Sequence, residues 1–404
     1  MSYMRIGINA SFLRKPGTGI GQVTANFLRK LAEYHVSNMT YDGSAQYMIP
    51  DTKYILYTEE PIDFPLPANF TNRHFLPQYW KRDDLIRKWL WERQVAREAT
   101  KDDCNAFISL YQSSTTFPSP RVNRHPSPIA HTMIVHDIIP RLFPAYRGNL
   151  RQAYYWKMVE RGITRADRIM STSEHTKNDL IRELDIQKNS ISVAYPAAAP
   201  RFHEKLSHEA LMAVLQKYDL KSGYIYHGGG LEIRKNTSTL LCAYKQLRDT
   251  TENIPPLVIS GKIHSKNNTL ATDAESLIED LGLKKNVRLL GFVPDADMPA
   301  LYQGALFFVY PSLYEGFGLP VLEALSLGTP TLTSPVSSLP EVGGDAVLYA
   351  DPENAEDMVR QMKRLLTDET LRAALSAKSA KQASRFDWES FTQNVLANIQ
   401  KSRL

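Results

Sequence analysis

A strand, a glycine turn and a helix in direct succession constrain the fold of this 404-residue chain more than any other feature. The apolar run at 306–310 predicts a buried parallel strand, and apolar residues at helical spacing over 319–327 predict a helix. The turn Gly316-Phe317-Gly318 lies between them, where free N–H groups and a helix dipole favour an anionic ligand. Glu315 and Glu323 flank this turn and offer acceptors for hydroxyl groups. The segment therefore predicts a site for a ligand such as a nucleotide sugar.

A second glycine turn, Gly228-Gly229-Gly230, follows the apolar run at 224–227. Arg234 and Lys235 come next, just before a helix predicted over 236–249. Glycines let the backbone approach a bulky anion, and a basic pair neutralises a diphosphate. The Gly-Lys-Ser/Thr ending of a Walker loop is missing, so an ordinary ATP-type loop is excluded. A surface turn with a solvated basic pair is the alternative.

Both segments resemble the retaining glycosyltransferases of family 4, which have the GT-B architecture. The string PSLYEGFGLPVLEA resembles the Glu-x7-Glu signature of that family, and residues 228–236 resemble its G-x-L-E-x-R-K-N element. Many members carry an Arg after the first glycine of that element, where this chain has Gly229 or Gly230. The fold implied is α/β, with two Rossmann-like domains whose parallel sheets face an interdomain cleft.

The resemblance also implies roles for individual residues. Glu323 corresponds to the residue that binds the ribose hydroxyls of the nucleotide, and Glu315 to the residue that contacts the donor sugar. Arg234 and Lys235 would hold the donor diphosphate. The backbone positions expected to bind the donor are Gly229, Gly230, Gly316, Phe317, Gly318 and Leu319. A helix cap at Glu315 and a solvated Glu323 are the alternatives for the two carboxylates.

Two elements of the first half complete the predicted site. His136 ends a strand predicted over 129–136, at the sheet edge where α/β proteins bind ligands. It resembles the His of the family's V-H-D element, which contacts the donor sugar; a structural His is the alternative. Gly19 and Gly21 belong to a G-x-G-x-G loop that lies too far from the first strand for a dinucleotide fingerprint. This loop resembles the family's G-G-x-G loop beside donor phosphate and acceptor, or is a plain helix-entry turn.

Alternating strands and helices predict parallel sheets in both halves. We expect residues 1–197 to form an N-terminal Rossmann-like acceptor domain and 198–385 a C-terminal Rossmann-like donor domain. By the resemblance, the helix at 386–404 crosses back onto the first domain. Residues 36–80 are the least periodic and are expected to form loops or an insertion. The strands expected lie at 4–8, 54–58, 129–136, 168–171, 191–194, 224–227, 257–260, 287–290 and 306–310.

Composition limits the location and partners of the protein. Cys104 and Cys242 are the only cysteines, which excludes a disulfide framework and a Cys-based zinc site. No signal-peptide start and no apolar run of about 20 residues is present, so we expect a soluble, cytoplasmic protein. The net charge is +5, and the first half is the basic half. The Trp- and Arg-rich stretch 80–101 fits either peripheral contact with the inner face of a membrane or ordinary packing. No nucleic-acid motif accompanies this charge, so no nucleic-acid partner is expected.

The resemblance implies retaining transfer of a hexose from a nucleotide sugar to a glycan or lipid-linked glycan acceptor in polysaccharide biosynthesis. GDP-mannose is the donor that we favour, because an Arg is missing beside Gly229 and the chain loosely resembles polysaccharide mannosyltransferases. No Asp-x-Asp element appears where a cation would bridge the diphosphate, so we expect neither metal nor cofactor. A sugar-nucleotide epimerase of the same architecture and a catalytically silent sugar-nucleotide binding module are the alternatives.

Overall fold

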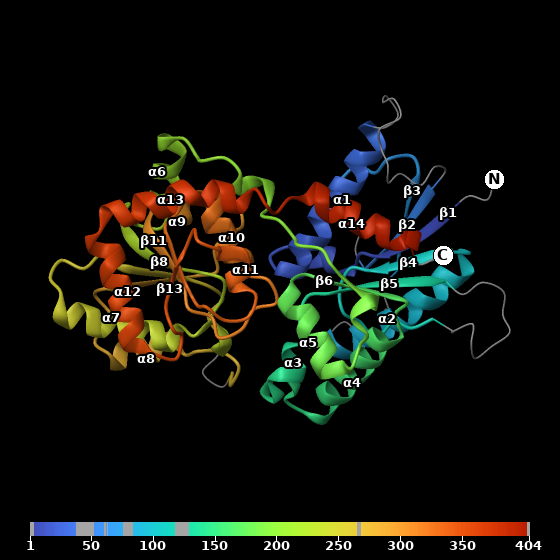
Figure 1. Ribbon diagram of the computed structural model, residues 1–404, viewed down its shortest axis with the longest axis horizontal. Helices are drawn as coiled ribbons and strands as arrows, with labels where there is room; N and C mark the ends of the chain where they lie inside the picture. Colours follow the sequence, from blue (N-terminus) through green and yellow to red (C-terminus); the bar gives the residue numbers. More distant parts are fainter. Residues whose placement is uncertain are drawn as a thin grey trace. The chain divides into compact units, whose positions relative to one another are not determined.

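The computed structural model describes residues 4–37, 52–59, 62, 64–75, 84–117, 129–264 and 268–401, and the chain divides into two compact units (Figure 1). The first unit comprises Met1–Pro196 and Asp387–Leu404, and the second comprises Ala197–Phe386. Within the described residues each unit contains one sheet, and all the strand pairs in both sheets are parallel. Cys104 and Cys242 are free thiols, as predicted.

The sheet of the first unit has the strand order β3-β2-β1-β4-β5-β6-β7. Its strands are β1 (Met4–Asn9), β2 (Thr52–Thr58), β3 (Phe70–His74), β4 (Ala106–Ser109), β5 (Ala130–Val135), β6 (Arg168–Ser171) and β7 (Ile191–Val193). The helices are η1 (Ser11–Arg14), α1 (Gly19–Ser37), α2 (Asp84–Lys101), α3 (Ile139–Leu142), η2 (Pro144–Arg147), α4 (Leu150–Arg165), α5 (Glu174–Leu184), η3 (Lys188–Ser190) and α14 (Trp388–Lys401). The central strands β1, β4 and β5 are buried along nearly their whole length, as expected for a sheet that is covered on both faces.

Helix α14 belongs to the first unit, although it follows the second unit in the sequence. It packs along α1, where the rings of Phe27 and Phe391 meet edge to face with centroids 6.0 Å apart. Lys30 of α1 lies 3.1 Å from Glu389 of α14. The first unit is thus assembled from the two ends of the sequence.

The sheet of the second unit has the strand order β10-β9-β8-β11-β12-β13. Its strands are β8 (Tyr224–His227), β9 (Leu257–Ser260), β10 (Val287–Gly291), β11 (Ala305–Tyr310), β12 (Thr331–Thr333) and β13 (Leu348–Tyr349). The helices are η4 (Pro200–Phe202), α6 (His208–Lys217), η5 (Ile233–Lys235), α7 (Thr237–Thr250), α8 (Ala274–Asp280), α9 (Met298–Gly304), α10 (Leu319–Ser326), α11 (Leu339–Gly343), α12 (Ala355–Thr367) and α13 (Glu369–Ala383).

Alternation along β8 and β11 divides the core of the second unit between the two faces of its sheet. Ile225, Phe307 and Val309 pack with the buried side chains of α7, α8 and α12. Tyr226 and Phe308 lie on the other face, where the ring of Tyr302 from α9 contacts both, with centroids 5.2 and 5.0 Å away. This aromatic face also carries Tyr310, the last residue of β11, which directly precedes the predicted site segment.

The least periodic segment, 36–80, is not made of loops alone. It supplies β2 and also the edge strand β3, in which only Phe70 is buried. One buried residue in five leaves no apolar pattern to detect, which explains why the sequence did not predict β3. Within the same segment, 38–51 and 76–80 lie outside the described residues.

Ordinary packing accounts for two tryptophans of the stretch 80–101. Trp91 of α2 is completely buried, and its ring stacks on Phe75 at 4.2 Å between centroids. Trp89 packs against the core formed by α4, α5 and β5, and Trp80 lies outside the described residues. Among the helices described, none is long and apolar enough to cross a membrane.

Candidate functional site

The predicted strand, turn and helix are β11, Gly316-Phe317-Gly318 and α10. Gly318 caps α10 with φ of +111°, a conformation that L side chains rarely adopt. A Cβ at this position would also lie 2.8 Å from Cδ2 of Leu339. Backbone conformation and space therefore both require glycine here.

Ser337 and Ser338 hold this turn in place. Ser338 Oγ donates to the carbonyl oxygens of Glu315 (2.9 Å) and Phe317 (2.7 Å), and the Glu315 N–H donates to Ser337 Oγ (2.9 Å). The first N–H groups of a helix have no acceptor within it, and no described residue accepts one from Gly318 or Leu319. The start of α10 therefore presents two backbone donors and the positive end of its dipole.

Glu315 is buried, and four donors converge on its Oε1 atom. Lys235 Nζ, Ser312 Oγ and a terminal nitrogen of Arg234 each lie 2.7 Å away, and Tyr310 Oη donates from 2.8 Å. Burial alone would raise the pKa of this carboxyl, but the charges of Arg234 and Lys235 outweigh burial and lower it to about 2. Glu315 is ionised at neutral pH. Among the described residues, none hydrogen-bonds Oε2, which leaves that oxygen for a ligand.

The two glycine segments meet because the backbone of Arg234 is bonded to the other segment. Its carbonyl oxygen accepts from the Leu313 N–H (2.8 Å), and Ser312 Oγ lies 3.0 Å from the same oxygen. Gly229 lies against the same strand and helix, since a Cβ there would be 3.0 Å from Tyr310 and 3.1 Å from Pro320. Gly229 and Gly230 both have positive φ, +93° and +104°. The structure thus brings together the carboxylate, the basic pair and both glycine turns.

The basic pair faces carboxylates rather than solvent. Lys235 is 5% exposed and donates to Glu315 and to the Tyr310 hydroxyl. Burial lowers the pKa of Lys235, and the nearby Arg234 charge acts in the same direction. Arg234 also pairs with Glu232 at 2.8 Å. The surface-turn alternative with solvated charges is therefore wrong, whereas diphosphate binding by this pair stays a prediction.

Glu323 lies in the first turns of α10 and is 6% exposed. Tyr302 Oη donates to its Oε2 atom from 2.9 Å. Burial raises the pKa of Glu323 to about 7. It is therefore not a solvated helix residue, and its two possible charge states coexist near neutral pH.

The sequence did not reveal the side chains that hold these two glutamates. Tyr310 and Ser312 flank Pro311, the first residue of the recognised string, so their closeness to Glu315 could have suggested a supporting role. Tyr302 lies on a different helix, 21 positions before Glu323, and no local pattern pointed to it.

His136 directly follows β5 in the first unit, at the carboxyl edge of the sheet. Its ring Nε2 donates to the Leu110 carbonyl at 2.9 Å, and its N–H donates to Gln112 at 3.2 Å. Burial lowers the pKa of the ring to about 4. The imidazole is therefore neutral at pH 7, and Nδ1 is an acceptor.

Gly19 and Gly21 form the start of α1, two strands from His136 along the same sheet edge. A Cβ on Gly21 would lie 1.9 Å from the Lys15 carbonyl oxygen, so the close turn of the preceding loop requires glycine there. The predicted residues thus form two groups, His136 with this loop in the first unit and the others in the second.

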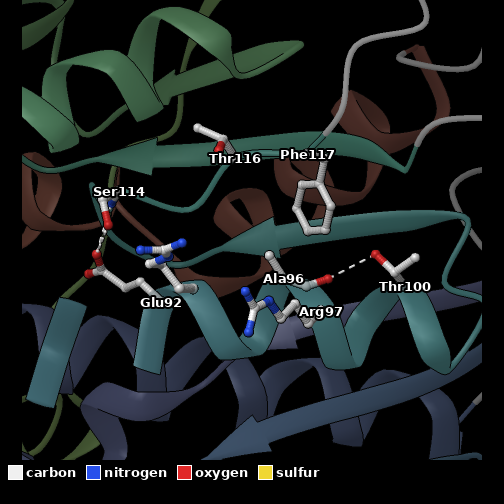
Figure 2. A pocket seen from close by; sticks show the side chains of 8 residues that line it. Glu92, Ala96, Arg97, Thr100, Ser114, Thr116 and Phe117 are labelled. Atoms are coloured by element: carbon white, nitrogen blue, oxygen red, sulfur yellow. Dashed lines mark hydrogen bonds between the residues drawn. The ribbon is translucent and has the colours of Figure 1, made fainter. Parts of the chain in front are cut away.

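A cavity of about 250 Å³ lies elsewhere in the first unit, between α2 and the segment that follows β4 (Figure 2). Its wall includes Glu92, whose carboxylate accepts from Ser114 Oγ (2.6 Å) and N–H (2.9 Å). The residues lining it are Glu92, Arg93, Ala96, Arg97, Thr100, Ser114, Thr116 and Phe117. None of them belongs to the predicted site.

Comparison with known proteins places the chain in a family. Residues 211–382 match the family model described as "Glycosyl transferases group 1". The O-antigen chain mannosyltransferase B of Escherichia coli is 37% identical over 262 residues, 65% of this chain and 68% of that protein. The serotype-specific mannosyltransferase WbdA of E. coli is 31% identical over 301 residues, 73% of this chain but only 36% of WbdA.

The crystal structure of WaaG, a glycosyltransferase involved in lipopolysaccharide biosynthesis, superposes with a TM-score of 0.71 at 16% identity, covering 98% of this chain and 99% of WaaG. At this identity the likeness concerns the fold, and it confirms the predicted GT-B architecture. With the sequence matches it leads to one conclusion: the chain belongs to the group 1 glycosyltransferases.

Proposed function

We propose that this glycosyltransferase acts in the cytoplasm as a retaining, metal-independent mannosyltransferase of polysaccharide biosynthesis. Its relatives imply a nucleotide-sugar donor and a glycan acceptor. For the finer assignment, the donor is GDP-mannose and the acceptor a glycan or lipid-linked glycan. Support comes from two E. coli relatives named mannosyltransferases, one of them of the O-antigen chain.

The observation that carries the proposal is the cluster of Glu315, Arg234 and Lys235 beside the start of α10. Residues 80 positions apart in the sequence meet at 2.7 Å. Cleavage of a sugar–diphosphate bond needs positive charge and N–H groups that already point at the leaving group. The basic pair supplies the charge, and the N–H groups of Gly318 and Leu319 supply the donors. The cluster therefore has the parts that such a reaction requires.

In the proposed reaction, the bond between the anomeric carbon and the diphosphate oxygen breaks, and its electron pair leaves with the diphosphate. The acceptor hydroxyl oxygen bonds to the carbon on the same face, and its proton passes to the leaving phosphate. Glu315 Oε2 accepts from the donor sugar, and Glu323 accepts from the ribose hydroxyls. His136 Nδ1 accepts a hydrogen bond from the sugar near the reacting carbon.

A thermal-shift screen of nucleotide sugars tests the donor. A ligand that binds only the folded protein raises its stability by mass action, by about 2.7 kcal/mol at 100 times Kd. We expect GDP-mannose to give the largest shift among GDP- and UDP-linked hexoses. A larger shift with a UDP-hexose would contradict the mannose assignment. Absence of any shift, or formation of an epimer without acceptor, would contradict the proposed reaction.

Removal of metal tests the role of the basic pair. If Arg234, Lys235 and the turn donors stabilise the leaving diphosphate, mannosyl transfer should keep its full rate in excess EDTA. The measurement is the initial rate with and without EDTA, followed by addition of Mg²⁺ or Mn²⁺. Complete loss of transfer that either cation restores would show that this part of the proposal is wrong.

A further inference from the structure

A buried carboxylate outside the predicted site joins three elements of the first unit. Glu59 directly follows β2, and its side chain is 1% exposed. Its Oε1 lies 3.0 Å from Nε of Arg14, and its Oε2 lies 2.8 Å from Nε of Arg87 in α2. The two arginine side chains are themselves only 11% and 14% exposed. Loss of one partner from such a cluster leaves a buried charge without compensation.

Arg14 connects this cluster to the glycine loop. It is the last residue of η1 and directly precedes the loop 15–21. The other half of η1 is held by Phe12, whose ring lies 4.5 Å from that of Tyr111, with the Lys88 ammonium 5.2 Å above it. Arg87 and Lys88 are neighbours on α2. Lys88 contacts Phe12, and Arg87 pairs with Glu59, which in turn pairs with Arg14. One turn of α2 therefore contacts both ends of this arrangement.

The loop itself is shaped by local hydrogen bonds. The Lys15 carbonyl accepts from the N–H (3.1 Å) and the Oγ1 (2.8 Å) of Thr18. The Gly21 N–H donates to Thr18 Oγ1 at 3.1 Å. These bonds fix the shape of the loop but not its place on the sheet, which depends on η1 before it and α1 after it.

We propose that Glu59 is a positioning residue: by holding Arg14, it fixes η1 and thereby the glycine loop at the carboxyl edge of the first sheet. The consequence for transfer rests on the proposed function, in which this loop borders the donor phosphate and the acceptor. The anchoring itself does not depend on that function.

Glu59→Gln tests the proposal in the full-length protein, because it keeps the size of the side chain and removes its charge. Hydrogen exchange of the amides at 17–21 should become at least about tenfold faster, while exchange in the second unit stays unchanged. The mannosyl-transfer kcat should fall by about 10- to 100-fold, the scale for a misplaced positioning group. The Kd for GDP should not change, because we assign nucleotide contacts to the second unit.

Glu98→Gln is the matched control, since Glu98 pairs with Lys101 on the surface of α2 at 2.8 Å. It should leave loop exchange and kcat at wild-type values. If Glu59→Gln is too unstable to purify, adding Arg14→Gln and Arg87→Gln removes all three charges of the cluster and should restore folding but not the slow exchange of the loop.

Wild-type exchange at 17–21 in folded Glu59→Gln or in the triple variant would overturn the proposal. Inactivity of the wild-type enzyme with every donor would instead count against the proposed function, and the exchange measurement would still decide whether Glu59 anchors the loop.

Discussion

Glu315→Gln should lower the kcat of transfer about 100-fold, the scale for removing one preorganised charged group from a transition state. The amide keeps an oxygen that can accept from Ser312 and Tyr310, so the geometry of the turn should persist. What disappears is the negative charge beside the donor sugar, where positive charge develops as the bond breaks. Because this charge acts mainly in the transition state, the donor KM should change much less than kcat.

The same substitution should also destabilise the protein. A carboxyl whose pKa is lowered to about 2 stabilises the folded state above its ordinary pKa of 4.5, and this contribution disappears as pH falls toward 2. The lost contribution is about 3 kcal/mol at pH 7. Lys235→Met in the Glu315→Gln background removes the uncompensated ammonium and should recover part of the Tm, but not kcat. Unchanged kcat and KM in a folded Glu315→Gln variant would remove this residue from the site.

Glu323→Gln should have opposite effects on stability and on donor binding. With a pKa of about 7, the folded protein keeps the Glu323 proton that the unfolded chain releases near pH 4.5. Stability therefore falls between pH 4.5 and 7 and then stays level, a loss of about 3 kcal/mol. The amide does not ionise, so Glu323→Gln should be more stable than wild type at pH 8 and equal to it at pH 4. Chemical denaturation at both pH values measures the difference.

The donor KM should rise in Glu323→Gln, because the ribose hydroxyls lose a charged acceptor in ground and transition states alike. For wild type, the donor KM should fall as pH rises through 7 and the carboxylate ionises. Tyr302→Phe offers a comparison, since it removes the hydroxyl that donates to Glu323 and leaves the ring in the core. A pH-independent donor KM in the wild type would contradict the role assigned to Glu323.

The sequence predicted most of the strands of both sheets. The strands expected at 168–171, 224–227 and 257–260 have those bounds in the structure. The strands β12 and β13 were not predicted, because three and two residues are too few to show a period. The strand β4 was missed as well, although it is as long as the four-residue strands that were predicted. Such short strands form because their neighbours in the sheet supply the pairing.

Some features of the candidate site were also predictable from the sequence, and others were not. Glu315, Glu323 and the glycine turn were predicted as site residues because they lie in one segment whose residue types indicate a binding site. The ion pairs of Lys235 and Arg234 with Glu315 connect separate segments, and only the folded sheet brings them together. The state of Glu323 was equally hidden, since its raised pKa depends on burial. The residues of the candidate site could be proposed from the sequence, whereas their charge states and their hydrogen-bond and ion-pair partners could not.

The position of α14 has a consequence for synthesis of the protein. Phe391, Val395 and Ile399 of this helix are buried in the first unit. While the ribosome is still producing the second unit, α14 has not yet been synthesised. The surface of α1 that these residues cover in the folded protein is therefore still exposed. Domains generally fold in the order of their synthesis, yet here the unit made first must wait for the last residues described. During that interval the nascent chain presents apolar surface to which a chaperone can bind.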